Sequence, residues 1–221
     1  AKVKATPINF GAVGFSPVKF VTKTENEYEA AKKSGTLPDP PKHIFWNLLH
    51  WFKESVTQDL EFLYQRIEEV ANEDVKNLLK VVFSDTVFRT SYIDLRSSRF
   101  IRTMPKEKLT NFNPNVLFQF RKKLMSSAHQ VSLFSRKTES IEAEWNPKPS
   151  VVMVKQEDAR KLSFNNKEFD TIITSPPYGE EKNTVGYSRW AKFSLMWLRL
   201  DGRAIKEAER QTLGAIAVAN M

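Results

Sequence analysis

Apolar residues recur every three or four positions, as they do on one face of an α-helix, over five stretches of the chain. These stretches are His43–Glu54, Thr57–Ala71, Val75–Phe83, Asn115–Phe134 and Ser188–Leu200. Asn72 stands just before the third stretch, where its side chain can cap the first helical turn. Ser16–Thr24 can also be helical, and the proline-rich segment Ser34–Lys42 predicts a loop. The pattern therefore predicts a largely helical middle of the chain.

Three shorter runs are typical of β-strands instead. Ile8–Phe15 ends near a glycine, while Val151–Val154 and Phe169–Thr174 are rich in β-branched residues and lie about 15 residues apart. Two short apolar strands with a brief crossover between them are expected to be neighbours in a parallel sheet. The predicted fold class is therefore α/β. Residues 1–36 and 146–221 would form the sheet-containing part, and residues 37–145 a helical, basic region inserted between them.

Composition narrows the classes of protein that fit. The 221 residues include no Cys, which excludes disulfides, thiolate zinc sites and a Cys nucleophile. The three histidines, His43, His50 and His129, lack the spacing of metal ligands, so no metal is expected. No apolar run reaches the roughly 18 residues of a membrane span, and Ala1–Phe20 lacks the apolar stretch of a signal peptide. We therefore expect a soluble, cytoplasmic protein without a membrane partner.

Positive charge is concentrated in the helical region. The chain has a net charge of +8, and the segment Thr86–Lys137 holds 11 Lys+Arg against two acids, a net +9. Nucleic-acid phosphates bind such a segment with release of counterions. A charged face that only keeps the protein soluble gives the same pattern. The residues that we expect to contact DNA phosphates are Arg96, Arg99, Arg102, Arg121, Lys122 and Lys123.

The sharpest chemical pattern directly follows the run Phe169–Thr174 and consists of Ser175, Pro176, Pro177 and Tyr178. In an open α/β sheet, ligands bind at the carboxyl ends of the strands, which is where this sequence would stand. The two prolines stiffen the loop. A serine hydroxyl and a neighbouring proline carbonyl can accept two hydrogen bonds from one amino group. An aromatic ring two residues on can stack on the planar system that bears the amine.

The sequence Ser175-Pro-Pro-Tyr178 resembles the signature of the DNA amino-methyltransferases, which has Asp, Asn or Ser before Pro-Pro and an aromatic residue after it. In that family the serine form is associated mainly with N4 of cytosine, and the other forms with N6 of adenine. The resemblance implies a Rossmann-like methyltransferase sheet, S-adenosylmethionine (AdoMet) as cofactor and double-stranded DNA as partner. It also implies that Ser175 and Pro176 hold the target amine, and that Tyr178 stacks on a base flipped out of the duplex.

A second family element, G-D-A-R-x-L, is similar to the segment Glu157–Leu162 between the two predicted strands. The resemblance implies that Asp158 receives the adenine amine of AdoMet, with Ala159 and Thr174 as further cofactor contacts. Gly14–Pro17 is weakly similar to the family's D-x-N-P element, with a glycine in place of the ribose-binding acid. The chain departs from the family in one respect, because no G-x-G occurs in it and the glycine-rich AdoMet loop is lacking. A second chain or a missing segment is expected to supply that loop.

The sequence thus predicts a site-specific DNA methyltransferase of the restriction–modification type, prokaryotic or from a phage, with cytosine N4 favoured over adenine N6. Tyr187 and Arg189, which follow the motif, are further expected DNA contacts. Two alternatives stay open. The chain is a catalytically incompetent DNA-binding fragment or a subunit of a split methyltransferase, because it lacks the cofactor loop. Or the methyl acceptor is an RNA or a protein, because related enzymes use Asp-Pro-Pro-Tyr or Asn-Pro-Pro-Tyr on those substrates.

Overall fold

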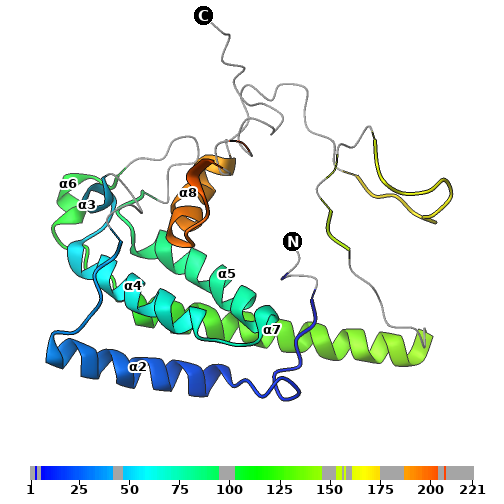
Figure 1. Cartoon of the computed structure of the whole chain (residues 1–221), viewed down its shortest axis with the longest axis horizontal. Coiled ribbons are helices and arrows are strands. Elements are labelled where there is room, and N and C mark those ends of the chain that lie inside the picture. The colour runs from blue at the N-terminus through cyan, green and yellow to red at the C-terminus, as the bar shows by residue number, and fades with distance from the viewer. Residues whose placement is uncertain are drawn as a thin grey trace, which may run out of the picture.

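The computed structural model describes residues 3, 6–41, 47–94, 103–145, 153–155, 157, 161–174, 187–203 and 207, apart from the side chains of residues 142, 143, 145 and 187–190. Its helices are α2 (Pro17–Ser34), α3 (Leu48–Trp51), α4 (Glu54–Glu68), α5 (Glu73–Thr90), α6 (Lys106–Leu109), α7 (Val116–Trp145) and α8 (Tyr187–Trp197). The long helices form a bundle, with α2 along one side and α8 against α5 (Figure 1).

Side-chain caps fix where the main helices begin. Asn72 caps α5 as predicted, because its side-chain oxygen accepts a hydrogen bond from the backbone N–H of Val75 at 3.0 Å. Asn115 caps α7 in the same way and accepts from the backbone N–H of Phe118 at 2.8 Å. The stripe predicted for Asn115–Phe134 is therefore helical, but α7 continues beyond it to Trp145.

The helix predicted for Ser16–Thr24 is confirmed, and it is longer than the apolar pattern indicates. Its N-terminus is capped by Ser16, and the helix ends at Gly35, which adopts the left-handed conformation with φ 69°. The backbone N–H of Thr36 then donates to the carbonyl of Ala31 at 2.9 Å, so the last turn is closed as in a Schellman motif. Beyond Thr24 the helix buries Tyr28 and packs Ala31 against the core, but most residues there are polar and leave a weak apolar pattern.

One hydrophobic core joins the helices, with α5 at its centre. Helix α5 packs against α4, α7 and α8, while α2 packs against α7 and α4. The most deeply buried apolar side chains are Leu60, Leu63, Ile67, Val75, Leu79, Val82, Phe83, Val87, Ile93, Leu124 and Trp197. Thus α2 and α8, which belong to the two outer segments of the chain, share a core with the helices between them. Where the sequence divides into functional units stays a prediction.

The predicted α/β fold class is wrong for the part of the chain that the structure describes. That part is helical and contains no sheet, and its β-pairing is limited to isolated bridges such as the antiparallel one between Ile93 and Thr103. In the run Phe169–Thr174, Ile172 is 80% and Ile173 94% exposed. A β-branched run forms a strand only where a neighbouring strand takes its backbone hydrogen bonds, and no described segment lies beside this one in that way.

The other two predicted strands are also corrected. Ile8–Phe15 forms turns, because the side chain of Asn9 accepts from the N–H of Ala12 at 3.1 Å and the N–H of Phe15 donates to the carbonyl of Phe10 at 2.9 Å. In Val151–Val154 the last two residues are described and are not a strand, while 151 and 152 lie outside the described residues.

The first predicted helix of the middle region is largely replaced by other structure. Within His43–Glu54, only Leu48–Trp51 is a described helix, and residues 42–46 lie outside the described residues. Phe52 is extended, with φ −140° and ψ 148°, and its side chain is buried. The next helix, α4, therefore starts at Glu54, three residues earlier than its apolar stripe indicates. In the part of the chain that is described, no helix is both long and apolar enough to cross a membrane.

Candidate functional site

The motif residues Ser175, Pro176, Pro177 and Tyr178 lie outside the described residues. The same holds for Asp158 and Ala159, and for the expected DNA contacts Arg96, Arg99 and Arg102. Tyr187 and Arg189 lie in the first turn of α8, but their side chains are outside the described part. Thr174, Arg121, Lys122 and Lys123 are fully described, as are residues 161–173, which lead to the motif.

Glu157 and Ser163, which stand on either side of Asp158 in the sequence, are bound to each other. The carboxylate of Glu157 accepts a hydrogen bond from the backbone N–H of Ser163 at 3.0 Å and a second one from the Ser163 hydroxyl. These hydrogen bonds hold the pKa of the Glu157 carboxyl below its ordinary value. The two residues are therefore fixed to each other, while Asp158 itself lies outside the described residues.

Aromatic and cationic contacts link Ser163 to the residues that precede the motif. The ammonium group of Lys155 donates to the Ser163 hydroxyl at 2.8 Å and lies 4.6 Å from the ring centroid of Phe164. The rings of Phe164 and Phe169 meet edge to face, with their centroids 4.8 Å apart. Phe169 begins the run that leads to Ser175. Phe164, which follows Ser163, is thus in direct contact with the start of the run that leads to the motif.

This arrangement fits the adenine end of AdoMet at one point. A carboxylate such as Asp158 is an acceptor-only group, which suits a base amine as donor. Thr174, the one predicted cofactor contact within the described residues, is exposed. The described residues also contain no cluster of three or more His, Cys, Asp or Glu side chains that could hold a metal ion.

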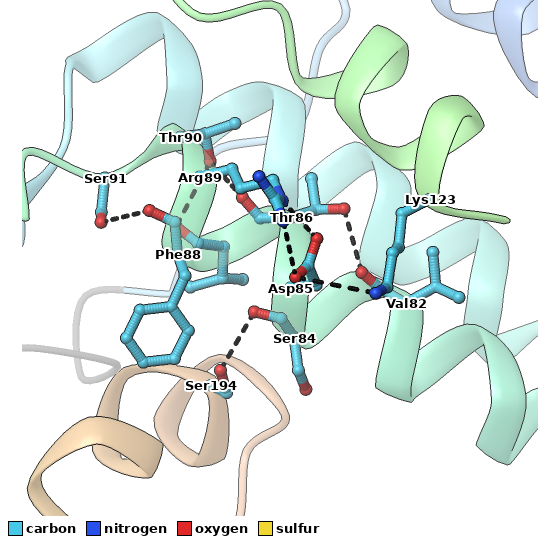
Figure 2. A network of polar contacts seen from close by, with 11 residues as sticks. Val82, Ser84, Asp85, Thr86, Phe88, Arg89, Thr90, Ser91, Lys123 and Ser194 are labelled. Atoms are coloured by element: carbon cyan, nitrogen blue, oxygen red, sulfur yellow. Dashed lines mark hydrogen bonds and ion pairs between the residues drawn. The ribbon is translucent and has the colours of Figure 1, made fainter. Parts of the chain in front are cut away.

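Helix α8, which follows the motif in the sequence, is anchored in the helical core. Phe193 packs edge to face on Trp51, with centroids 5.0 Å apart, and the indole of Trp197 is fully buried. The hydroxyl of Ser194 donates to the backbone carbonyl of Ser84 on α5 at 3.2 Å, as Figure 2 shows. The described chain that follows the motif therefore begins with a firmly packed helix.

The three described basic residues of α7 that we expected to contact phosphates have different surroundings. Arg121 forms an ion pair with Glu25 of α2 at 3.3 Å, and Lys123 lies 4.0 Å from a carboxylate oxygen of Asp85 on α5. Asp85 also binds Arg89, so this carboxylate lies between two cations (Figure 2). Lys122 is exposed, and no described acid forms an ion pair with it.

Two residues that the sequence pattern did not single out form an ion pair in which the acid is buried and the cation is partly exposed. Glu61 of α4 is buried and pairs with the guanidinium of Arg199, which follows α8. The sequence does contain two signals of this ion pair. One is an acid in the apolar stripe of α4, beside Leu60, and the other is a cation just past the end of an apolar helix. Because the two residues are far apart in the sequence, neither signal alone could predict that they pair with each other.

Comparison with known proteins gives one match that covers nearly the whole chain. This chain is similar to the Type II methyltransferase M.MvaI of Kocuria varians, with 30% identity over 223 residues. The match covers 97% of this chain and 47% of that protein, so the chain spans about half the length of the curated relative. No family model matches the chain, and no solved structure gives a significant match.

Proposed function

We propose that this chain is a site-specific DNA amino-methyltransferase of a restriction–modification system, and that it methylates N4 of cytosine with AdoMet. The proposal rests on the similarity to a Type II methyltransferase along 97% of the chain. The sequence Ser175-Pro-Pro-Tyr178 lies within that chain and supplies the reacting groups. Since the relative is about twice as long, the activity is proposed for the chain together with any partner that completes it.

The roles of the motif residues follow from the chemistry of a base amine. The lone pair of such an amine is conjugated with the ring, so the free amine is a poor nucleophile. The Ser175 hydroxyl and the Pro176 carbonyl accept its two hydrogen bonds and free the lone pair, while Tyr178 stacks on the flipped base. When bound, AdoMet supplies a methyl group activated by its sulfonium. The cytosine nitrogen attacks this carbon, the new N–C bond forms as the C–S bond breaks, and the surplus amine proton leaves to water.

The protein groups that hold the two substrates are proposed to come from two parts of the chain. Asp158, in the loop closed by Glu157 and Ser163, accepts the adenine amine of AdoMet, with Ala159 and Thr174 beside it. DNA phosphates are bound by the basic helical region, and Tyr187 and Arg189 border the base pocket.

The experiment that tests this function is transfer of labelled methyl groups from AdoMet to three acceptors: unmethylated duplex DNA, tRNA and protein. Incorporation into DNA is the expected result. Incorporation into tRNA or protein alone would assign the chain to a different amino-methyltransferase class.

A second candidate function is DNA binding without catalysis, because the sequence contains no glycine-rich AdoMet loop. The two functions differ in their affinity for AdoMet. In calorimetric titration of the chain, saturable micromolar binding of AdoMet supports the enzyme. The absence of a heat signal supports a DNA-binding subunit that depends on a second chain for the cofactor.

A further inference from the structure

The long helix α7 carries an unusual distribution of charge. Between Val116 and Thr138 it contains five Lys or Arg residues and no acid. In Figure 1 this helix extends past the ends of α4 and α5. The part of the helix from Val116 to Thr138 presents cations at fixed spacing with no acid among them, which suits a stiff polyanion.

The direction in which each cation points follows from the helical period. Successive residues of an α-helix are rotated by about 100°, and Leu124 marks the side of α7 that faces the core, since it is fully buried. Arg121 and Lys123 then lie on the two flanks of the helix, toward α2 and α5, where Glu25 and Asp85 bind them. Lys122 lies on the side opposite to Leu124 and is exposed.

The outward side of α7 continues through further basic residues. Arg136 lies 14 positions after Lys122, which brings it close to the same face, and Lys137 is next to it. Both are exposed, and no described acid forms an ion pair with either. At about 1.5 Å per residue, Lys122 and Arg136 are roughly 21 Å apart along the axis. That length corresponds to about six base-pair steps of a duplex at about 3.4 Å each.

We infer that this outward face, formed by Lys122, Arg136 and Lys137, is the surface that docks on the phosphates of duplex DNA. Arg121 and Lys123 stabilise the bundle instead, because their ion pairs link α7 to α2 and α5. This inference rests on the proposed function and locates its DNA-binding surface. The sequence predicted phosphate contacts at the adjacent residues 121–123, whereas the inferred surface consists of cations spaced along one face of the helix.

The test uses fluorescence anisotropy of a labelled duplex with the 221-residue chain over a series of salt concentrations. The triple variant K122Q/R136Q/K137Q changes only exposed side chains of α7. It is expected to reduce the magnitude of the slope of log K against log salt by about 2.7, at about 0.9 per lost phosphate contact. The matched control K33Q/K106Q/K108Q removes the same charge from α2 and α6 and is expected to change the slope by less than about 1.

A second pair of variants tests whether Arg121 and Lys123 stabilise the helix bundle and do not bind DNA. E25Q/D85N removes the two acids that bind Arg121 and Lys123 and is expected to raise DNA affinity several-fold, because both cations become available to phosphates. R121Q/K123Q is expected to lower the unfolding midpoint while leaving most of the salt slope unchanged. Circular dichroism confirms that each variant is folded before its binding is measured.

Several outcomes overturn the inference. It is wrong if the control triple reduces the slope as much as the α7 triple does, or if R121Q/K123Q has the larger effect. Tighter binding of tRNA than of duplex DNA would assign the face to RNA. A chain that methylates DNA, but whose affinity is unchanged in K122Q/R136Q/K137Q, refutes this surface and leaves the proposed function intact. Loss of DNA binding in that variant, with no methyl transfer by the unaltered chain, supports the surface while the proposed function fails.

Discussion

The guanidinium of Arg199 reaches the buried carboxylate of Glu61 across 138 residues of sequence. The other carboxylate oxygen of Glu61 accepts from the side-chain amide of Gln65 at 2.9 Å, so both oxygens are bound. The guanidinium carbon of Arg199 also lies 4.4 Å from the ring centroid of Tyr64. Arg199 thereby fixes the C-terminal end of α8 to α4.

Removal of the Arg199 side chain should destabilise the fold. Arg199→Ala leaves the buried carboxylate of Glu61 without its cation, and we expect a loss of about 3 kcal/mol in the free energy of unfolding. Arg199 also has φ 59°, in the left-handed region. Arg199→Gly relieves the associated backbone strain and should therefore be less destabilising than Arg199→Ala by about 1 kcal/mol. Urea unfolding of the two variants measures both differences.

The double variant Glu61→Gln/Arg199→Ala provides the control. Because it removes the buried charge as well as its partner, it should recover part of the stability lost in Arg199→Ala. Equal stability of Arg199→Ala and the unaltered chain would show that the ion pair makes no net contribution.

Tyr64 should make the fold sensitive to alkali. Burial, followed by its hydrogen bond with Glu68, raises the pKa of Tyr64 from 10.0 to about 12. Because the folded-state pKa is the higher one, the contribution to stability is complete below pH 10 and is lost as the pH rises toward 12. We expect unfolding free energy to fall by about 2 kcal/mol over this range on account of Tyr64.

Tyr64→Phe identifies this contribution. The variant should show a shallower decline of stability between pH 10 and 12, measured by urea unfolding at each pH. The pKa of Tyr28 is raised as well, mainly by burial, so part of the decline should persist. An unchanged alkaline profile in Tyr64→Phe would contradict the assignment.

The helices of the bundle could be predicted because each has its own apolar stripe. The stripe Val75–Phe83 and the cap at Asn72 are local patterns, and both agree with α5. The run at Ile172 and Ile173 has an equally clear apolar pattern, yet these side chains are exposed and no described strand pairs with them. A strand depends on a distant neighbour, so its apolar run alone could not establish the sheet.

The basic residues show the same limit at the candidate site. Arg121, Lys122 and Lys123 are adjacent in sequence and were equivalent as predicted phosphate contacts. Two of them pair with an acid and Lys122 pairs with no described acid, and this difference depends on Glu25 and Asp85, which belong to other helices. Only the packing of the bundle determines which acid lies beside each flank of α7.

The loop closure by Glu157 should affect cofactor binding. Ser163→Ala removes the hydroxyl that donates to the Glu157 carboxylate. We expect the pKa of Glu157 to return toward its ordinary value and the affinity for AdoMet to fall several-fold, because the loop that contains Asp158 is less restricted. Calorimetric titration with AdoMet measures the affinity. Ser126→Ala, an exposed serine of α7, is the matched control, and equal affinities in the two variants would refute the positioning role.

All other proposed roles depend on methyl transfer to a cytosine amine that is held by Ser175 and Pro176, with Tyr178 stacked on the base. The most direct test is to methylate unmethylated duplex DNA with labelled AdoMet, digest it to nucleosides and identify the product by mass spectrometry. We expect N4-methylcytosine from the unaltered protein, in complex with any second chain that it requires. Ser175→Ala and Tyr178→Ala should reduce this product at least about 100-fold, as expected for loss of a group that acts in the transition state, while salt-sensitive DNA binding persists. N6-methyladenine as the product, or full turnover by either variant, would contradict it.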